Sequence, residues 1–151
     1  MHELTVPTAE DMKSFGRRLA GELRAGDLVV LTGDLGAGKT TLVQGIATGL
    51  GVQGPVLSPT FVIARSYRDG RLPLVHVDAY RLGSLVEVDD LDLDASVEES
   101  ATVVEWGAGL VEQLAADRLE VRILRSVDEN DETRRVTVSP LGARWTGVAI
   151  A

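Results

Sequence analysis

Residues 33–40 read GDLGAGKT, and this stretch fits the pattern G-x-x-x-x-G-K-[ST], which is typical of a loop that binds phosphate. Residues 27–31 (DLVVL) precede it as a short apolar run, which predicts a buried strand. Residues 41–50 carry Leu or Ile at every fourth position, which predicts a helix that Gly51 ends. The stretch therefore has the order of strand, loop and helix that a phosphate-binding loop needs.

The residue types of this loop predict its chemistry. Its glycines let backbone N–H groups turn inward, and the helix that follows adds the positive end of its dipole. We expect Lys39 to reach the β- and γ-phosphates of a nucleotide and the Thr40 hydroxyl to bind Mg²⁺. Only Lys13 and Lys39 are lysines, so composition does not explain a lysine here. The loop residues expected to bind the nucleotide are Leu35, Gly36, Ala37, Gly38, Lys39, Thr40 and Thr41.

Length and composition predict one globular domain spanning residues 1–151, with 44% hydrophobic residues. No apolar run approaches the roughly 20 residues that cross a membrane, and the first residues do not resemble a signal peptide. The chain has no cysteine, which excludes disulfides, thiolate metal sites and cysteine nucleophiles and is compatible with the cytoplasm. A net charge of −8 makes the chain a poor binder of nucleic acid by itself, so we expect any contact with RNA to run through a partner.

The remaining pattern predicts a mixed α/β sheet with helices packed on it. Thr8 can cap a first helix that ends before Gly26, and the same position can also lie near a nucleotide base. Two strands joined by a turn at Asp69 and Gly70 predict an antiparallel hairpin, which excludes a fully parallel sheet. Residues 84–100 predict an acidic surface, either solvated or used for docking a partner. The expected strands are 62–67, 72–78, 101–105, 119–125 and 134–139, with a short helix at 108–115.

Two carboxylates stand at predicted strand ends, Asp78 after residues 74–77 and Glu105 after residues 102–104. Ligands of open α/β sheets collect at the carboxyl ends of the strands. If both strands run parallel beside the strand before the loop, one carboxylate holds the metal and the other orients a water. The sequence does not say which does which, and a turn-starting carboxylate is the alternative for each.

Three further features have two interpretations each. Ser58 and Thr60 lie in a loop that either senses the γ-phosphate or forms a rigid proline turn. Trp106 is either a core aromatic or a lid and docking residue. His76 lies in the middle of a strand, and we interpret it as structural rather than catalytic.

Four motifs, GDLGAGKTT at 33–41, SPTF at 58–61, HVDAYRL at 76–82 and VEW at 104–106, together closely resemble the bacterial TsaE (YjeE) family. Their order and spacing match, and the resemblance covers most of the chain. One departure is Gly107, where the family more usually has proline.

The resemblance implies a single-domain P-loop NTPase that needs ATP and Mg²⁺ for threonylcarbamoyl-adenosine modification of tRNA. It implies TsaD and TsaB as partners, weak ATPase activity alone, and tRNA contact only through the complex. It also implies that Lys39, Asp78 and Glu105 are catalytic, and that Thr40, Asp78 and Glu105 are metal ligands. Thr8 and Arg134 fall where members of the family approach the nucleotide.

Three rival functions remain on sequence grounds. A small-molecule P-loop kinase needs an arginine-rich lid, for which Arg65, Arg68 and Arg71 are a loose candidate cluster. A GTPase switch is a second rival, but the chain lacks the Asn-Lys-x-Asp motif that reads the guanine base. A nucleotide-binding scaffold without turnover would not need Asp78 or Glu105.

Overall fold

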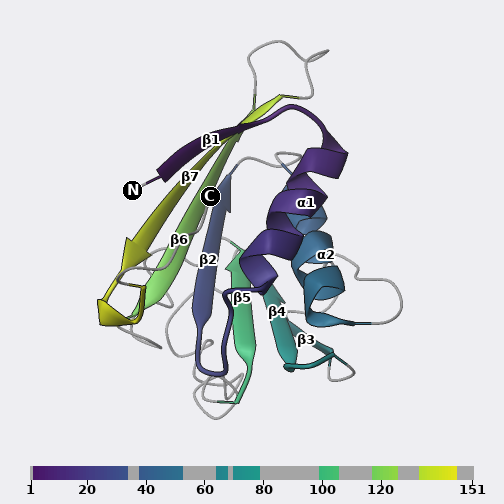
Figure 1. Ribbon diagram of the computed structural model, residues 1–151, viewed down its shortest axis with the longest axis vertical. Coiled ribbons are helices and arrows are strands. Elements are labelled where there is room, and N and C mark those ends of the chain that lie inside the picture. The colour runs from purple at the N-terminus through teal and green to yellow at the C-terminus, as the bar shows by residue number, and fades with distance from the viewer. Residues whose placement is uncertain are drawn as a thin grey trace.

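The structure, a computed structural model, describes residues 2–33, 38–52, 64–67, 70–78, 99–105, 117–125 and 133–145. Figure 1 shows one sheet with two helices over one of its faces. The elements are β1 (His2–Val6), α1 (Ala9–Ala20), β2 (Leu28–Gly33), α2 (Lys39–Leu50), β3 (Ala64–Tyr67), β4 (Leu74–Asp78), β5 (Ala101–Glu105), β6 (Arg118–Arg125), β7 (Arg134–Leu141) and the 3-10 helix η3 (Ala143–Trp145). The acidic stretch at 84–98 and the predicted helix at 108–115 lie outside the described residues.

The sheet has seven strands in the order β1-β7-β6-β2-β5-β4-β3. Its centre is parallel, because β2 pairs with both β5 and β6 in parallel and β4 pairs with β5 in parallel. Antiparallel strands close both edges, with β3 on β4 at one edge and β7 and β1 beyond β6 at the other. The mixed sheet and the antiparallel β3–β4 hairpin confirm the predicted fold class.

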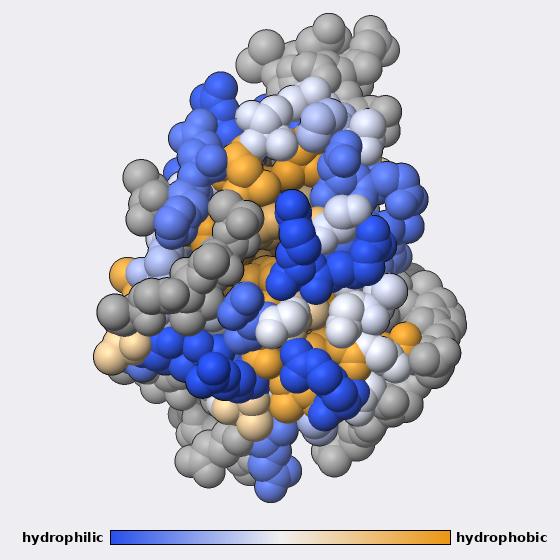
Figure 2. Space-filling view, viewed as in Figure 1, coloured by the Kyte–Doolittle hydropathy of each residue, from blue (hydrophilic) through white to orange (hydrophobic). Residues whose placement is uncertain are grey.

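The core lies between the sheet and the two helices. Met12, Phe15 and Leu19 form the buried stripe of α1, and their spacing of three and four residues places them on one face of the helix. Strand β5 is buried at every position and β2 at its first four, which explains why both read as continuous apolar runs. Hydrophilic side chains cover most of the described surface over the helices in Figure 2. Leu124, 38% exposed, is the only large apolar side chain counted as exposed among the described residues.

Glycines let α1 and α2 approach each other closely while running in the same direction. A Cβ on Gly45 would lie 2.4 Å from the Lys13 carbonyl oxygen, and a Cβ on Gly49 would lie 2.9 Å from the Arg17 carbonyl oxygen. From the other helix, a Cβ on Gly16 would lie 2.6 Å from the carbonyl oxygen of Leu42. The backbones therefore touch with no room for a side chain, and both helices begin at the same end of the sheet.

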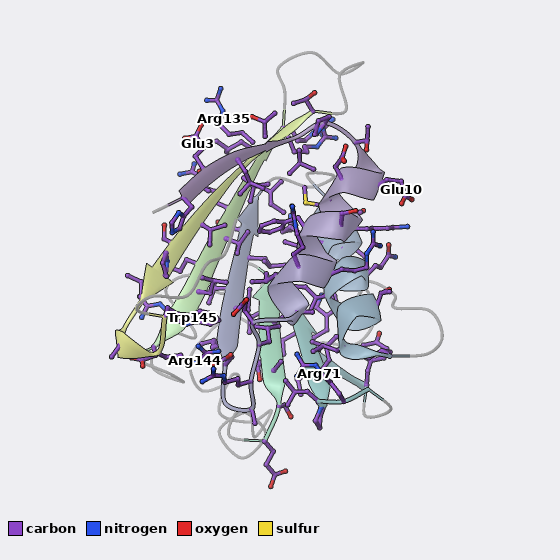
Figure 3. The ribbon with its side chains drawn as sticks, viewed as in Figure 1. Glu3, Glu10, Arg71, Arg135, Arg144 and Trp145 are labelled. Atoms are coloured by element: carbon purple, nitrogen blue, oxygen red, sulfur yellow. The ribbon has the colours of Figure 1, made fainter. Side chains whose placement is uncertain are left out.

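Two elements of the fold have no clear signal in the sequence and were not predicted. Strand β1 pairs antiparallel with β7, and only Val6 among its five residues is buried, so the strand lacks a strong apolar signal. An ion pair between Glu3 and Arg135 crosses this edge at 3.4 Å and is labelled in Figure 3. The second missed element is η3, in a tail where the sequence showed no pattern. None of the described helices has the length and apolar content needed to cross a bilayer.

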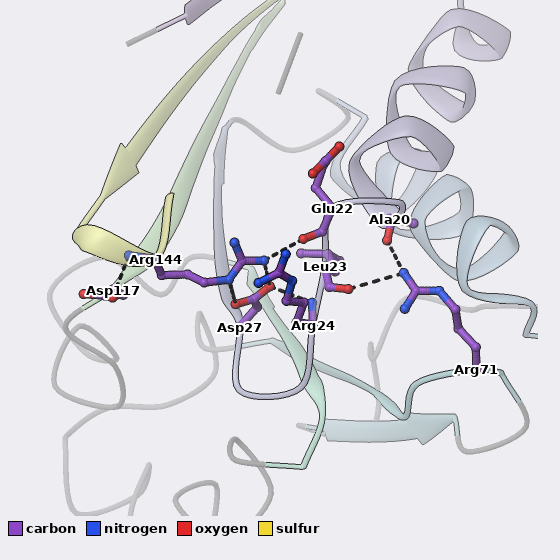
Figure 4. Close-up of polar contacts among 8 residues, drawn as sticks. All are labelled: Ala20, Glu22, Leu23, Arg24, Asp27, Arg71, Asp117 and Arg144. Carbon is purple, nitrogen blue, oxygen red and sulfur yellow. Dashed lines mark hydrogen bonds and ion pairs between the residues drawn. The ribbon is translucent and has the colours of Figure 1, made fainter. Parts of the chain in front are cut away.

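The short helix η3 is attached to the turn that precedes β2 (Figure 4). Arg144 Nε and Nη2 donate to the two carboxylate oxygens of Asp27 at 2.9 and 2.8 Å, and Asp27 is only 4% exposed. Arg144 Nη2 also donates to the Glu22 carbonyl at 2.6 Å, and the Arg144 backbone N–H donates to Asp117 at 3.0 Å. Its guanidinium carbon lies 4.3 Å from the ring centroid of Trp145. This bidentate pair joins the last described segment to the amino end of the central strand.

A second arginine, Arg71, forms hydrogen bonds at the carboxyl ends of both helices. Arg71 Nη2 donates to the carbonyls of Ala20 at 2.6 Å and Leu23 at 3.3 Å, which lie at and beyond the end of α1. The Arg71 backbone N–H donates to the Leu50 carbonyl at the end of α2, at 2.7 Å. The turn between β3 and β4 therefore lies at the end of the molecule where both helices finish.

We expect Gly45→Ala to lower the free energy of unfolding by about 1–3 kcal/mol, because its methyl group would meet the backbone of α1 and force the helices apart. Urea unfolding followed by circular dichroism measures this. Gly21→Ala is the matched control, because Gly21 has φ −62 in the right-handed region; we expect a change within about 0.5 kcal/mol. Equal stability of Gly45→Ala and the wild type would contradict the close packing.

We expect Arg144→Ala to lower the free energy of unfolding by about 3 kcal/mol, because it leaves the buried Asp27 carboxylate without its charged partner. Arg135→Ala is the control in the same sheet, because its pair with Glu3 is exposed on both sides; the expected loss there is below about 1 kcal/mol. Thermal and urea unfolding of both variants give the comparison. Similar losses would show that burial of the Arg144–Asp27 pair has no energetic consequence.

Candidate functional site

The parallel strands bring the predicted carboxylates to one edge of the sheet. In the register, Leu31 of β2 lies opposite Glu105 of β5, and Glu105 lies opposite Asp78 of β4. Gly33, the first residue of the glycine loop, ends β2 two positions beyond Leu31. The strands run parallel, as the site prediction required. Of the two strands that carry the carboxylates, β5 is a direct neighbour of β2, whereas β4 lies one strand further away.

The glycine loop connects β2 to α2 at this same edge. Residues 34–37, including the predicted contacts Leu35, Gly36 and Ala37, lie outside the described residues. Gly38 caps α2 in the left-handed conformation, with φ 110, which favours glycine. It offers no side-chain cap, and helix geometry leaves the first N–H groups of α2 without acceptors inside the helix. The start of α2 is therefore suited to an anionic ligand.

Lys39 is a buried lysine, 6% exposed, in the first turn of α2. Its Nζ donates to the Gly33 carbonyl at 2.7 Å, so its side chain spans from the start of α2 to the end of β2. Thr40 and Thr41, the next two residues of the helix, are half-buried. The structure thus places the lysine amine and the Thr40 residue beside the loop, as the motif predicts.

Glu105 has a partner that the sequence analysis did not identify. Its Oε2 lies 2.5 Å from His76 Nε2, and the side chains are 7% and 0% exposed. One feature of the sequence could have suggested the contact: His76 stands two residues before Asp78 at a predicted strand end, and Glu105 stands at the end of another predicted strand. His76 Nδ1 is buried and has no hydrogen-bond partner in the described part of the chain.

Thr8 and Arg134 are brought to the same edge from the other side of the sheet. Strand β1 lies antiparallel to β7 with Val6 opposite Arg134, and Arg125 at the end of β6 is also opposite Arg134. Thr8 follows β1 as the cap of α1; its hydroxyl accepts from the Asp11 N–H at 3.2 Å and donates to Asp11 Oδ2 at 2.7 Å. The capping interpretation of Thr8 is therefore confirmed.

Several of the polar side chains labelled in Figure 3 lie toward one or the other end of the sheet. Figure 3 shows Arg135 and Glu10 toward the end where the described part of the glycine loop lies, and Arg144 toward the opposite end. The guanidinium of Arg134 donates to the Thr133 carbonyl at 3.1 Å. The side chain of Asp78, and all of Ser58, Thr60 and Trp106, lie outside what the structure describes.

The residues at this edge fit Mg²⁺ and a nucleotide in their chemistry. A threonine hydroxyl and a carboxylate are hard oxygen ligands, and Mg²⁺ is commonly completed by substrate phosphates and water. Within the described residues, no three His, Cys, Asp or Glu side chains form a metal-binding group. The buried lysine and the uncapped helix start supply positive charge for phosphate.

Comparison with known proteins gives a consistent family. A family model described as "Threonylcarbamoyl adenosine biosynthesis protein TsaE" matches residues 6–136. A Streptomyces coelicolor protein named "tRNA threonylcarbamoyladenosine biosynthesis protein TsaE" is 63% identical over 139 residues, which cover 89% of this chain and 93% of the relative. Proteins of the same name from Mycobacterium tuberculosis and Bacillus subtilis are 48% and 41% identical, covering 89% and 90% of this chain and 84% of each relative.

A solved structure agrees with the fold. The crystal structure of Bacillus subtilis YdiB superimposes with a TM-score of 0.78 at 34% sequence identity. The match covers 96% of this chain and 88% of that protein.

Proposed function

The chain belongs to the TsaE family, as its four motifs predicted, and we propose that it is the Mg²⁺-dependent ATPase subunit of threonylcarbamoyl-adenosine biosynthesis on tRNA. The proposal includes a cytoplasmic location and TsaD and TsaB as partners, with tRNA held by those partners. The net charge of −8 supports this division, because a chain this acidic repels nucleic acid unless a partner supplies the contact.

The observation that carries the ATPase proposal is the placement of Lys39 and Glu105 at the same edge of the sheet: Lys39 donates to Gly33 at the end of β2, and Glu105 lies opposite Leu31 of that strand. In the proposal, Lys39 exchanges the Gly33 carbonyl for nucleotide phosphates, and the N–H groups at the start of α2 donate to them. The loop residues Leu35, Gly36, Ala37, Gly38 and Thr41 contribute further contacts, and Thr8 and Arg134 approach the nucleotide from β1 and β7.

Metal binding and water activation are divided among three residues in this proposal. The Thr40 hydroxyl holds Mg²⁺, together with one of the two carboxylates Asp78 and Glu105, and the other carboxylate orients the attacking water. Glu105 stands on the strand adjacent to β2, which favours it for the group nearer the glycine loop. When bound, Mg²⁺-ATP supplies the bond to be cleaved and a cation that neutralises phosphate charge. Ser58, Thr60 and Trp106 remain proposed switch and partner residues.

The position of Arg71 argues against the small-molecule kinase. Arg71 is the member of the arginine cluster whose side chain the structure describes, and it donates to carbonyls beyond the end of α1. That end of α1 lies away from the glycine loop, because α1 and α2 run in the same direction and α2 begins at the loop. An arginine held there cannot act as part of a lid over the phosphates.

We expect Lys39→Ala to weaken ATP binding at least about tenfold, because a charge-assisted hydrogen bond to phosphate contributes roughly 1.5–3 kcal/mol. Isothermal titration calorimetry with Mg²⁺-ATP measures the change. Lys13→Ala is the matched control, because it removes the only other lysine in the chain, on α1; its affinity should stay within about twofold of the wild type. Unchanged affinity in Lys39→Ala would remove the site assignment.

The proposed function itself is tested by reconstitution with TsaB, TsaD, tRNA, ATP and threonylcarbamoyl-adenylate. We expect repeated modification cycles only when this protein is present. Glu105→Gln should bind ATP normally but lower phosphate release about 100-fold or more, as expected for a lost general base or metal ligand. Glu120→Gln is the control, because this residue pairs with Arg118 at the amino end of β6, away from the carboxyl edge of the sheet, and should keep wild-type turnover.

Each arm of the reconstitution has an outcome that would contradict it. Modification cycles of equal number with and without this protein would overturn the subunit's role. Phosphate release at the wild-type rate from Glu105→Gln would be compatible with ATPase activity but would show that Glu105 has no role in it.

A further inference from the structure

A buried hydrogen bond joins the candidate catalytic strand to its neighbour. His76 of β4 and Glu105 of β5 meet at 2.5 Å between Nε2 and Oε2, and neither side chain is more than 7% exposed. His76 lies on the same face of β4 as Leu74, and Glu105 lies on the same face of β5 as Val103; Leu74 and Val103 are both members of the hydrophobic core. The pair therefore lies where the apolar core ends and the carboxyl edge of the sheet begins.

The direction of the bond follows from the charge of the carboxyl group. An ionised Glu105 can only accept hydrogen bonds, and in that state His76 carries a hydrogen on Nε2 and donates it to Glu105. Among the described residues, the one hydrogen-bond partner of the Glu105 carboxylate is His76, which contacts Oε2 and not Oε1. One oxygen of the carboxylate is thus held by the protein while the other remains to serve a ligand.

The stability of the fold alone does not explain why the chain buries the His76–Glu105 pair. Replacing buried polar or charged pairs by apolar residues of similar volume is often neutral or stabilising. The neighbours of His76 along β4, Val75 and Val77, are buried apolar residues, so the strand elsewhere follows that rule. His76 also buries its Nδ1 without a partner among the described residues, which adds a cost.

We propose that His76 is a positioning residue for the ATPase site, and that its Nε2–H holds the Glu105 carboxylate in the orientation in which it serves Mg²⁺ or the attacking water. This inference rests on the proposed function, because it assigns His76 to the reaction through Glu105. Partners of this kind, one step removed from a metal ligand, typically change metal affinity or activity about 10–100-fold when they are lost.

The kinetic test compares His76→Phe, which keeps a ring and removes the donor, with His76→Gln, whose side-chain amide can still donate. We expect His76→Phe to lower ATP turnover in the reconstituted mixture about tenfold or more. Its affinity for ATP measured without Mg²⁺ should change less than about twofold, because His76 does not act on the phosphates. His76→Gln should recover most of the turnover.

The Glu105→Gln background separates positioning from a general structural role. If His76 acts through Glu105, adding His76→Phe to Glu105→Gln lowers turnover no further. Thr102→Val is the control on β5, because it changes a fully buried polar side chain three positions from Glu105; its turnover should stay within about twofold of the wild type. An equal loss from His76→Phe in both backgrounds, or no recovery in His76→Gln, would overturn the proposal.

A second measurement needs neither ATP hydrolysis nor a His76 variant that folds. The chain has only two histidines, His2 and His76, so imidazole ¹⁵N spectra of the protein alone are simple to assign. We expect His76 to be protonated at Nε2, with a slowly exchanging proton whose resonance shifts in Glu105→Gln. An unprotonated Nε2, or a resonance that Glu105→Gln leaves unchanged, would overturn the positioning role. If the wild type hydrolyses no ATP, the proposed function fails, and this spectrum still decides whether His76 orients Glu105.

Discussion

The parallel ladder between β2 and β5 is the constraint on which the candidate site depends. It places Glu105 opposite Leu31, two positions before the glycine loop begins. Because side chains alternate along a strand, a slip of one residue would move Glu105 to the other face of the sheet and away from its histidine partner. The register is held by the apolar residues of both strands, which are buried almost throughout. The same burial that stabilises the centre of the sheet therefore sets the position of the site.

The molecule separates its structural anchors from its candidate site. The Arg144–Asp27 pair and the contacts of Arg71 lie where the central strand begins and the helices end. The buried polar groups at the other end, Lys39 and the His76–Glu105 pair, bring charge or hydrogen-bonding capacity to the start of α2. Buried polar groups are costly, and a buried lysine and a buried histidine–glutamate pair at the carboxyl edge are more readily explained by a ligand than by stability.

The two helices join these ends as one unit. Their backbones are in contact at Gly16 and Gly45, so α1 cannot shift without moving α2. Because α2 begins at Gly38 and α1 begins at the Thr8 cap, this packing places the first turn of each helix at the carboxyl edge. The Thr8 cap and the described start of α2 therefore lie at one edge of the sheet, on two helices whose backbones are in contact.

Most of the fold and part of the site could be predicted from local sequence. The glycine loop, the apolar runs of β2 and β5, the stripe of α1 and the β3–β4 hairpin are local patterns, because backbone freedom, burial and turn chemistry act over a few residues. Strand β1 and η3 could not be predicted, because their places depend on β7 and on Asp27, which are distant in the sequence. For the same reason, the order of β2, β5 and β4, the placement of Thr8 and Arg134 at the same end of β1 and β7, and the bond from His76 to Glu105 were decided only by the tertiary structure. Sequence determined which chemical groups stand at the strand ends, whereas strand pairing decided which of them meet, because the free energy of that pairing comes from contacts between segments far apart in the chain.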